Sequence, residues 1–183
     1  MNTLLIFTDA ATSSSENISV GAFLLLEEKE FQKYIDFNLN DLFIQLENKI
    51  VYKKYNSKKS TWSEIQTAID ALNHTHLPSA SIVKMYTDCQ SLCDLLGKRK
   101  EKLLKNNFIT RAGKVLQNAD LYKELYQTAE KFQLSTLKIK GHQKVSDSTR
   151  LEEKIFSILD KFSRRKLREL LTLIDCNPIR TSS

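Results

Sequence analysis

The sequence predicts an α/β fold with one mixed sheet and a long C-terminal helix. Short apolar and β-branched runs, typical of buried strands, alternate with segments whose apolar residues recur every three or four positions, as in amphipathic helices. The expected order is βββαβααβα. Because no linker-like change in composition and no internal repeat divides the chain, we expect one domain over residues 1–176 and a flexible tail at residues 177–183.

The N-terminal part of the chain is expected to contribute the first three strands. Apolar runs at about 3–8, 18–26 and 50–56 have the length and composition of strands, and the polar residues 12–17 predict a turn between the first two. Residues 27–48 stay open, because the first four look like a solvated loop and the rest fit either a strand or a short helix.

Helices and strands alternate in the remainder. Ser60-Thr61, followed by apolar residues at 3-4-3 spacing, predicts a capped amphipathic helix over about 61–73. We then expect a strand at 82–86, a helix after Thr87-Asp88, a helix from about 118 to 132 and a strand at 134–139. A long amphipathic helix over about 151–173 completes the fold.

Composition and charge exclude several classes of protein. With 41% hydrophobic residues, 27% charged residues, 4 Gly and 2 Pro, the chain is neither collagen-like nor largely disordered. No apolar run is long enough for a signal peptide or a transmembrane helix. Cys89, Cys93 and Cys176 are odd in number and lack zinc-site spacing, which favours reduced thiols and predicts a cytoplasmic location.

Two of the expected strands are followed by an aspartate in the same way. Phe7-Thr8-Asp9 and Tyr86-Thr87-Asp88 each place a carboxylate at the carboxyl end of a strand, where sites assemble in open α/β sheets. If the two strands are parallel neighbours, Asp9 and Asp88 come close together and need a cation to offset their repulsion. The alternative is that each aspartate only ends a strand or caps a helix.

Two helical acids could join this pair. Glu64 precedes Ile65 and so borders the apolar face of its helix, although a glutamate in a first helical turn is also ordinary. Asp160 is enclosed by apolar residues in Ile158-Leu159-Asp160-Lys161-Phe162, where burial of its charge would require a partner.

The motifs, taken in order, resemble those of the ribonuclease H family, type 1. They are Asp9-Ala10-Ala11, Glu64 in the helix that begins at Ser60-Thr61, Tyr86-Thr87-Asp88-Cys89-Gln90-Ser91, Asn118-Ala119-Asp120-Leu121, Lys140-Gly141-His142, and Asp160 followed by Ser163-Arg164. The resemblance spans about residues 3–170. It implies an RNase H-like fold, with a five-stranded sheet in the order 3-2-1-4-5 flanked by helices.

The resemblance also implies an activity. The protein would be a metal-dependent endonuclease that hydrolyses the RNA strand of RNA/DNA hybrids. Asp9, Glu64, Asp88 and Asp160 would hold two Mg²⁺ ions, with Mn²⁺ as a substitute, because hard cations prefer carboxylate oxygens. His142 would move a proton or help to release product. Neither a membrane nor an obligate protein partner is implied.

The sequence departs from the family pattern in three places. Ala10 stands where glycine is common, and Ser60-Thr61 stand where many members have asparagines that touch the minor groove of the substrate. His142 and Asp160 are 18 positions apart, which is longer than usual and implies an inserted loop with extra helix. Asp147, Glu152 and Glu153 are therefore rival ligands, but only Asp160 has the setting Leu-Asp-x-Phe-Ser-Arg of the family helix.

Positive charge is concentrated in one segment. Residues 98–114 contain seven basic residues against Glu101 alone, so 7 − 1 equals the net charge of +6 of the whole chain. The segment resembles the basic protrusion with which many ribonucleases H grip the hybrid, although a solvated surface helix is the alternative. The nucleic-acid contacts we expect are Lys98, Arg99, Lys100, Lys102 and Lys105 in this segment, and Ala10, Ala11, Thr12, Ser60, Thr61 and Gln90 near the acids.

Two other functions stay open at this point. The chain could be a catalytically weak or inactive module that keeps the fold and binds nucleic acid or protein, because fold does not guarantee function. It could also be a related two-metal nuclease that acts on structured DNA, since the same carboxylates would serve that reaction. The presence of all four acids argues against the inactive module.

Overall fold

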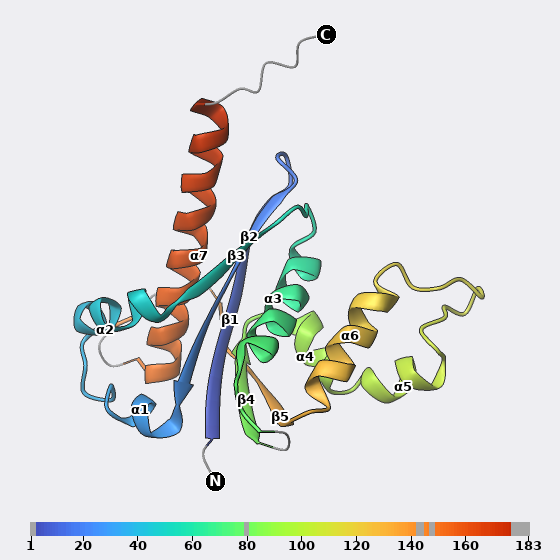
Figure 1. The fold of residues 1–183 in the computed structure, drawn as a ribbon, viewed down its shortest axis with the longest axis horizontal. Coiled ribbons are helices and arrows are strands. Elements are labelled where there is room, and N and C mark those ends of the chain that lie inside the picture. Colours follow the sequence, from blue (N-terminus) through green and yellow to red (C-terminus); the bar gives the residue numbers. More distant parts are fainter. Residues whose placement is uncertain (1–2, 79–80, 142–144, 147–148, 177–183) are drawn as a thin grey trace.

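The computed structural model describes residues 3–78, 81–141, 145–146 and 149–176. Its centre is a five-stranded sheet in the order β3-β2-β1-β4-β5, as expected (Figure 1). The strands are β1 (Thr3–Ser13), β2 (Ile18–Glu27), β3 (Val51–Tyr55), β4 (Ile82–Thr87) and β5 (Gln133–Lys138). β2 pairs antiparallel with β1 and β3, whereas β4 pairs parallel with β1 and β5, so the sheet is mixed.

Helices cover both faces of the sheet. They are α1 (Glu28–Gln32), α2 (Leu39–Leu46), the short 3₁₀ helix η1 (Glu47–Lys49), α3 (Ser60–His74), α4 (Gln90–Leu96), α5 (Lys100–Lys105), α6 (Ala119–Ala129) and α7 (Leu151–Cys176). In Figure 1, α3, α4 and α6 lie on one side of the sheet, whereas α7 lies on the other side with α1 and α2. The long C-terminal helix is therefore confirmed.

The central strand β1 separates two cores. Leu4 and Ile6 pack into the cluster that includes residues of α3 and α6, whereas Leu5 and Phe7 pack into the cluster that includes residues of α2 and α7. This division follows from the two-residue period of a strand, whose successive side chains point to opposite faces. Because helices cover both faces, side chains on both faces of this strand are buried, which explains the continuous apolar run from Leu4 to Phe7.

Residues 27–48, which the sequence left open, form short helices. α1 occupies most of the stretch that looked like a solvated loop, and α2 follows after a turn. α2 begins where the Asn38 side chain accepts a hydrogen bond from the Asp41 backbone amide at 2.9 Å. Leu42 and Leu46 are fully buried against the α7 side of the sheet, which holds the helix in place.

The expected cap of α3 is not formed. The helix begins at Ser60, one residue earlier than expected, and the residue at its N-cap is Lys59, whose side chain makes no capping hydrogen bond. The segment is held instead by packing and by a contact to the sheet, because Ser63 Oγ lies 2.6 Å from Ser19 Oγ of β2. Ser60 and Thr61 are exposed at the start of the helix.

α7 runs alongside the β1–β2 hairpin, where Leu167, Leu170 and Leu171 pack with Ile18 and Val20, and only its C-terminal end extends beyond the tip of the hairpin (Figure 1). Within the described residues, no helix is both long and apolar enough to cross a membrane. Residues 177–183, for which the sequence predicts a tail, lie outside the described residues.

Candidate metal centre

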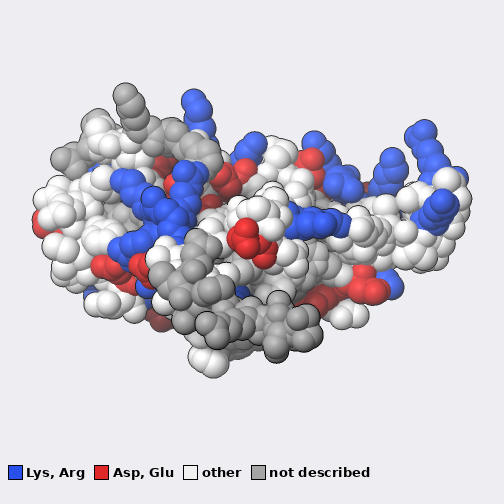
Figure 2. Space-filling model, turned by 90° about the horizontal axis from the view of Figure 1, so that it is seen from above, with Lys and Arg blue, Asp and Glu red and all other residues white. Residues whose placement is uncertain are grey.

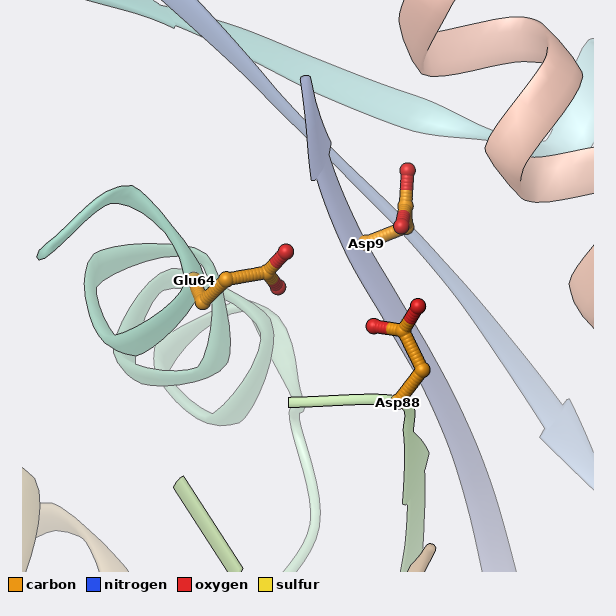
Figure 3. Close-up of side chains that lie close together, drawn as sticks. All are labelled: Asp9, Glu64 and Asp88. Carbon is orange, nitrogen blue, oxygen red and sulfur yellow. The ribbon is translucent and has the colours of Figure 1, made fainter. Parts of the chain in front are cut away.

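Three carboxylates from three different elements converge at the central strand. Asp9 lies in β1, Glu64 in α3 and Asp88 directly after β4, and their ligand oxygens all lie within 4.8 Å of one another. Figure 3 shows the side chains of Glu64 and Asp88 directed toward the part of β1 that carries Asp9. Asp9 and Glu64 are buried, with exposed fractions of 4% and 8%.

The parallel pairing of β1 with β4 brings the two aspartates together. The last pair in the register joins Phe7 to Tyr86, and each aspartate lies two residues beyond its member of that pair. β1 itself does not end at Asp9 as expected, because its antiparallel pairing with β2 continues to Ser13. The site therefore lies where β4 stops and leaves one edge of β1 open, rather than where both strands stop.

Glu64 is held against β1 through one of its two oxygens. The Ala10 backbone amide donates a hydrogen bond to Glu64 Oε1 at 3.2 Å. Glu64 Oε2 is buried and has no hydrogen-bond partner in the described part of the protein. Buried polar atoms nearly always have a partner, so an unpaired carboxylate oxygen beside two other carboxylates points to a ligand that supplies the missing contact.

Burial and mutual repulsion make this group of acids difficult to ionise. Burial, followed by the charges of Asp160 and Asp88, raises the pKa of Asp9 from 3.8 to about 7, although a hydrogen bond from Ser163 opposes this rise. The pKa of Glu64 is raised well above its ordinary value of 4.5, first by burial and then by the charges of Asp9 and Asp88. A bound cation would favour the ionised carboxylates and so lower the pKa of both Asp9 and Glu64.

The donor set fits a hard divalent cation. All three side chains of the cluster offer carboxylate oxygens and none offers nitrogen or sulfur, which suits Mg²⁺ or Mn²⁺ better than zinc or copper. Together with the unpaired Glu64 oxygen, this chemistry shows that the residues are compatible with the metal that the sequence predicts.

Asp160 lies at the same cavity but outside the three-carboxylate cluster. The cavity is lined by Asp9, Ala10, Ala11, Thr12, Glu64, Asp88, Asp160, Arg164, Leu167 and Arg168. Asp160 forms an ion pair with Arg164, which lies one helical turn further along α7. Asp160 Oδ1 and Arg164 Nη2 are 3.0 Å apart. Its rivals Glu152 and Glu153 do not line this cavity, and Asp147 lies outside the described residues.

The close approach of the chain to Asp88 explains why the middle residue of Lys140-Gly141-His142 is a glycine. A Cβ atom on Gly141 would lie 2.2 Å from Asp88 Oδ2, so any other residue would collide with the carboxylate. The glycine thus lets the chain after β5 pass close to Asp88. His142 itself lies outside the described residues.

The expected nucleic-acid contacts fall into three groups. Ala10, Ala11 and Thr12 line the cavity beside the acids. Ser60 and Thr61 are exposed at the start of α3. The Gln90 side chain is engaged within the protein, because it donates to Asp94 and accepts from Lys138, both at 2.7 Å.

The basic segment is partly neutralised by acidic neighbours. Lys98 pairs with Asp94 at 3.1 Å and Lys100 pairs with Glu130 at 3.5 Å. Arg99, Lys102 and Lys105 have no ion pair among the described residues. Figure 2 shows Lys and Arg at the end of the molecule where the α5–α6 loop extends, and a second group over α7.

Sequence reasoning did not give a role to Ser163 or Leu167 of α7. The cavity lining includes Leu167 and Arg168, and Ser163 donates a hydrogen bond to Asp9. Ser163 lies three residues after Asp160, so the shared helix face was a signal in the sequence. The contact between Ser163 and Asp9 could not be predicted in this way, because 154 positions separate the two residues in the sequence.

Comparison with solved structures places this architecture among RNase H-like folds. The N-terminal RNase H domain of Rv2228c from Mycobacterium tuberculosis matches with a TM-score of 0.59, at 9% identity, over 94% of this chain and 98% of that chain. The foamy viral protease-reverse transcriptase in complex with RNA/DNA hybrid matches with a TM-score of 0.54, at 11% identity, over 90% of this chain and 19% of that chain.

Sequence comparison then identifies the family. The RNase H family model matches residues 1–151, so the chain belongs to the RNase H family. A ribonuclease H from Symbiobacterium thermophilum is 31% identical over 91 residues, which cover 49% of this chain and 60% of the relative. The match thus spans less than two thirds of that relative's length. The expected family and fold are both confirmed.

Proposed function

We propose that the protein is a metal-dependent endonuclease that hydrolyses the RNA strand of RNA/DNA hybrids with the help of two divalent cations. The observation that carries the proposal is the convergence of Asp9, Glu64 and Asp88, with a buried Glu64 oxygen that has no partner among the described residues. Family membership narrows the reaction to phosphodiester hydrolysis. The named ribonuclease H relative supports the choice of RNA as the strand that is cut.

Asp9, Glu64, Asp88 and Asp160 would hold the two cations, with Mg²⁺ as the natural ion and Mn²⁺ as a substitute. When bound, such a pair of cations activates the attacking water and stabilises the leaving oxygen. The protein supplies the geometry. β1, α3 and β4 are packed in the core of the fold, so the carboxylates are placed before the substrate arrives.

The substrate would enter over the open edge of β1. Ala10, Ala11 and Thr12 line the cavity beyond the acids, and Arg164 and Arg168 line it from α7. A hybrid is recognised by its shape and by the 2′-hydroxyls of one strand, so these residues would contact sugar and phosphate with little preference for base sequence. The foamy viral neighbour was solved with an RNA/DNA hybrid and also with dsDNA, so it supports a nucleic-acid duplex as the ligand without distinguishing the two.

The test is a comparison of three substrates with the purified protein. We expect Mg²⁺-dependent cleavage of the RNA strand in an RNA/DNA hybrid, weak or no cleavage of double-stranded RNA and branched DNA, and loss of all cleavage in EDTA. Preferred cleavage of branched DNA would instead support the structured-DNA nuclease. Tight hybrid binding without cleavage in Mg²⁺ or Mn²⁺ would support the inactive binding module.

The basic segment should serve docking and not chemistry. Replacing Arg99, Lys102 and Lys105 by Gln should raise KM for a long hybrid and reduce the log–log salt slope by up to about one unit per lost phosphate contact, with kcat nearly unchanged. Steady-state kinetics at several salt concentrations measures KM, kcat and the salt slope. A matched control removes three exposed lysines elsewhere, Lys29, Lys33 and Lys54. Equal effects in the two triple variants would contradict a direct contact between the basic segment and the substrate.

His142 is proposed to act after the hybrid has docked. Its role rests on the Lys140-Gly141-His142 motif, and an imidazole near neutral pH can carry a proton or assist product release. We expect His142→Ala to lower kcat more than it raises KM. Single-turnover and steady-state rates separate the two parameters. A change confined to KM would make His142 a phosphate contact instead.

The remaining parts of the proposal concern the whole protein. We propose that residues 1–176 act as one domain in the cytoplasm and need no obligate protein partner. The cysteine pattern supports the location, and the thiols of Cys89 and Cys93 form no disulfide in the described part of the chain.

A further inference from the structure

Ser163 connects the C-terminal helix to the central strand at the metal centre. Its side chain is fully buried, and its Oγ atom donates a hydrogen bond to Asp9 Oδ2. In the described part of the chain, no other side chain donates a hydrogen bond to Asp9. The contact joins α7 to β1, two elements that lie far apart in the sequence.

We propose that Ser163 is a positioning residue, whose hydroxyl fixes the Asp9 carboxylate in the orientation that binds the divalent cation. A carboxylate held at one oxygen loses rotation about its Cβ–Cγ bond, so its other oxygen also keeps a fixed place. Hydrogen bonds to metal-ligating carboxylates tune the site in this way in many metalloproteins. The inference rests on the proposed metal centre, but it concerns a residue that does not itself bind metal.

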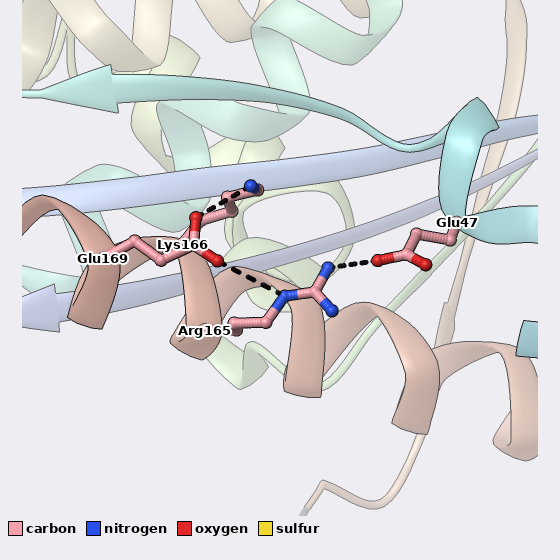
Figure 4. A network of polar contacts seen from close by, with 4 residues as sticks. All are labelled: Glu47, Arg165, Lys166 and Glu169. Atoms are coloured by element: carbon pink, nitrogen blue, oxygen red, sulfur yellow. Dashed lines mark hydrogen bonds and ion pairs between the residues drawn. The ribbon is translucent and has the colours of Figure 1, made fainter.

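The helix that carries Ser163 is held firmly on both sides of it. Phe162 is buried in the core between α7 and the sheet. Arg165 forms ion pairs with Glu47 of η1 and with Glu169 of α7 (Figure 4), and its guanidinium lies 5.2 Å from the centre of the Phe162 ring. The serine hydroxyl is therefore presented by a rigid element, which a positioning group requires.

A purely structural role is the alternative for this serine. Ser163 Oγ also lies 3.0 Å from the Asp160 carbonyl oxygen, an ordinary contact for a helical serine. The hydroxyl has one proton and cannot donate fully to both acceptors. An ionised carboxylate is the stronger acceptor, so the contact to Asp9 should prevail whenever Asp9 is charged, as it is when a cation is bound.

The experiment measures metal binding directly in the full chain, without substrate. Mg²⁺ and Mn²⁺ are titrated by calorimetry into the wild type, Ser163→Ala, Ser163→Thr and the control Ser157→Ala, and melting temperatures are recorded in EDTA. Ser157 lies on the same helix, is half-buried and does not line the cavity. We expect Ser163→Ala to weaken metal affinity by about tenfold or more. Ser157→Ala should bind as the wild type does, and Ser163→Thr should retain most of the affinity because it retains the hydroxyl.

The outcomes separate this inference from the proposed function. Equal metal affinity in the wild type and in folded Ser163→Ala would overturn the inference, as would a lower melting temperature in EDTA with no change in affinity. Absence of metal binding by the wild type would overturn it too, together with the proposed centre. Weaker binding by Ser163→Ala in a protein that does not cleave hybrids would support the inference and reject only the proposed function.

Discussion

Asp88→Asn is expected to reduce kcat for hybrid cleavage by about 10³-fold or more while the protein stays folded, and Asp9→Asn is expected to do the same. Each change replaces a charged oxygen donor by an amide in the cluster of three carboxylates, and metal-dependent hydrolysis depends on the charge of such donors. The substitution also removes repulsion between neighbouring acids. The melting temperature in EDTA should therefore stay the same or rise.

A matched control makes this result specific. Asp120 is almost fully exposed on α6 and pairs with Lys123, so Asp120→Asn removes a carboxylate from the surface without touching the cluster. Cleavage rates with saturating hybrid and Mg²⁺, together with circular dichroism spectra, compare the variants. Turnover near that of the wild type in Asp9→Asn or Asp88→Asn would exclude the two-metal interpretation.

The pair of aspartates could be predicted from the sequence because each one follows an apolar run. The parallel pairing of β1 with β4 then places the residues that follow the two runs side by side, although only β4 ends there. Glu64 could be predicted in part from its position beside Ile65 on an amphipathic helix. These signals lie within a few residues of the side chain concerned, and the structure places all three acids together.

Other features depend on contacts that the local sequence does not encode. β1 runs on to Ser13 because β2 pairs with it along its whole length, whereas the run of strong strand formers ends near Thr8. α1 and α2 have 5 and 8 residues, which is too short for a helical period to stand out from a strand pattern. α3 begins without the expected side-chain cap, because packing and the Ser63–Ser19 contact hold its first turn.

The metal-free protein is expected to lose stability as the pH rises from about 4 to about 7. The pKa of Asp9 is raised from 3.8 to about 7 in the folded state, chiefly by burial, so between these values the folded state holds a proton that the unfolded state has released. Stability then falls with increasing pH, because the unfolded state binds fewer protons than the folded state. The raised pKa of Glu64 acts in the same direction.

Urea denaturation in EDTA at pH 5.5 and at pH 7.5 measures this effect. For Asp9 alone, the decrease in unfolding free energy between the two pH values should be up to about 2 kcal/mol. Asp9→Asn should show a smaller decrease than the wild type, because it cannot ionise at this position, whereas Asp120→Asn should retain the full decrease. Equal decreases in the wild type and Asp9→Asn would contradict the assignment to Asp9.

Divalent metal should offset much of the loss of stability at high pH. A cation at the cluster favours the ionised carboxylates and binds only the folded state, so millimolar Mg²⁺ should raise the unfolding free energy more at pH 7.5 than at pH 5.5. The variant in which Asp9, Glu64, Asp88 and Asp160 are all replaced by their amides should show no such gain. If this variant responded to Mg²⁺ as the wild type does, the cation would bind elsewhere, and Asp9 and Glu64 would be buried for a reason other than metal binding.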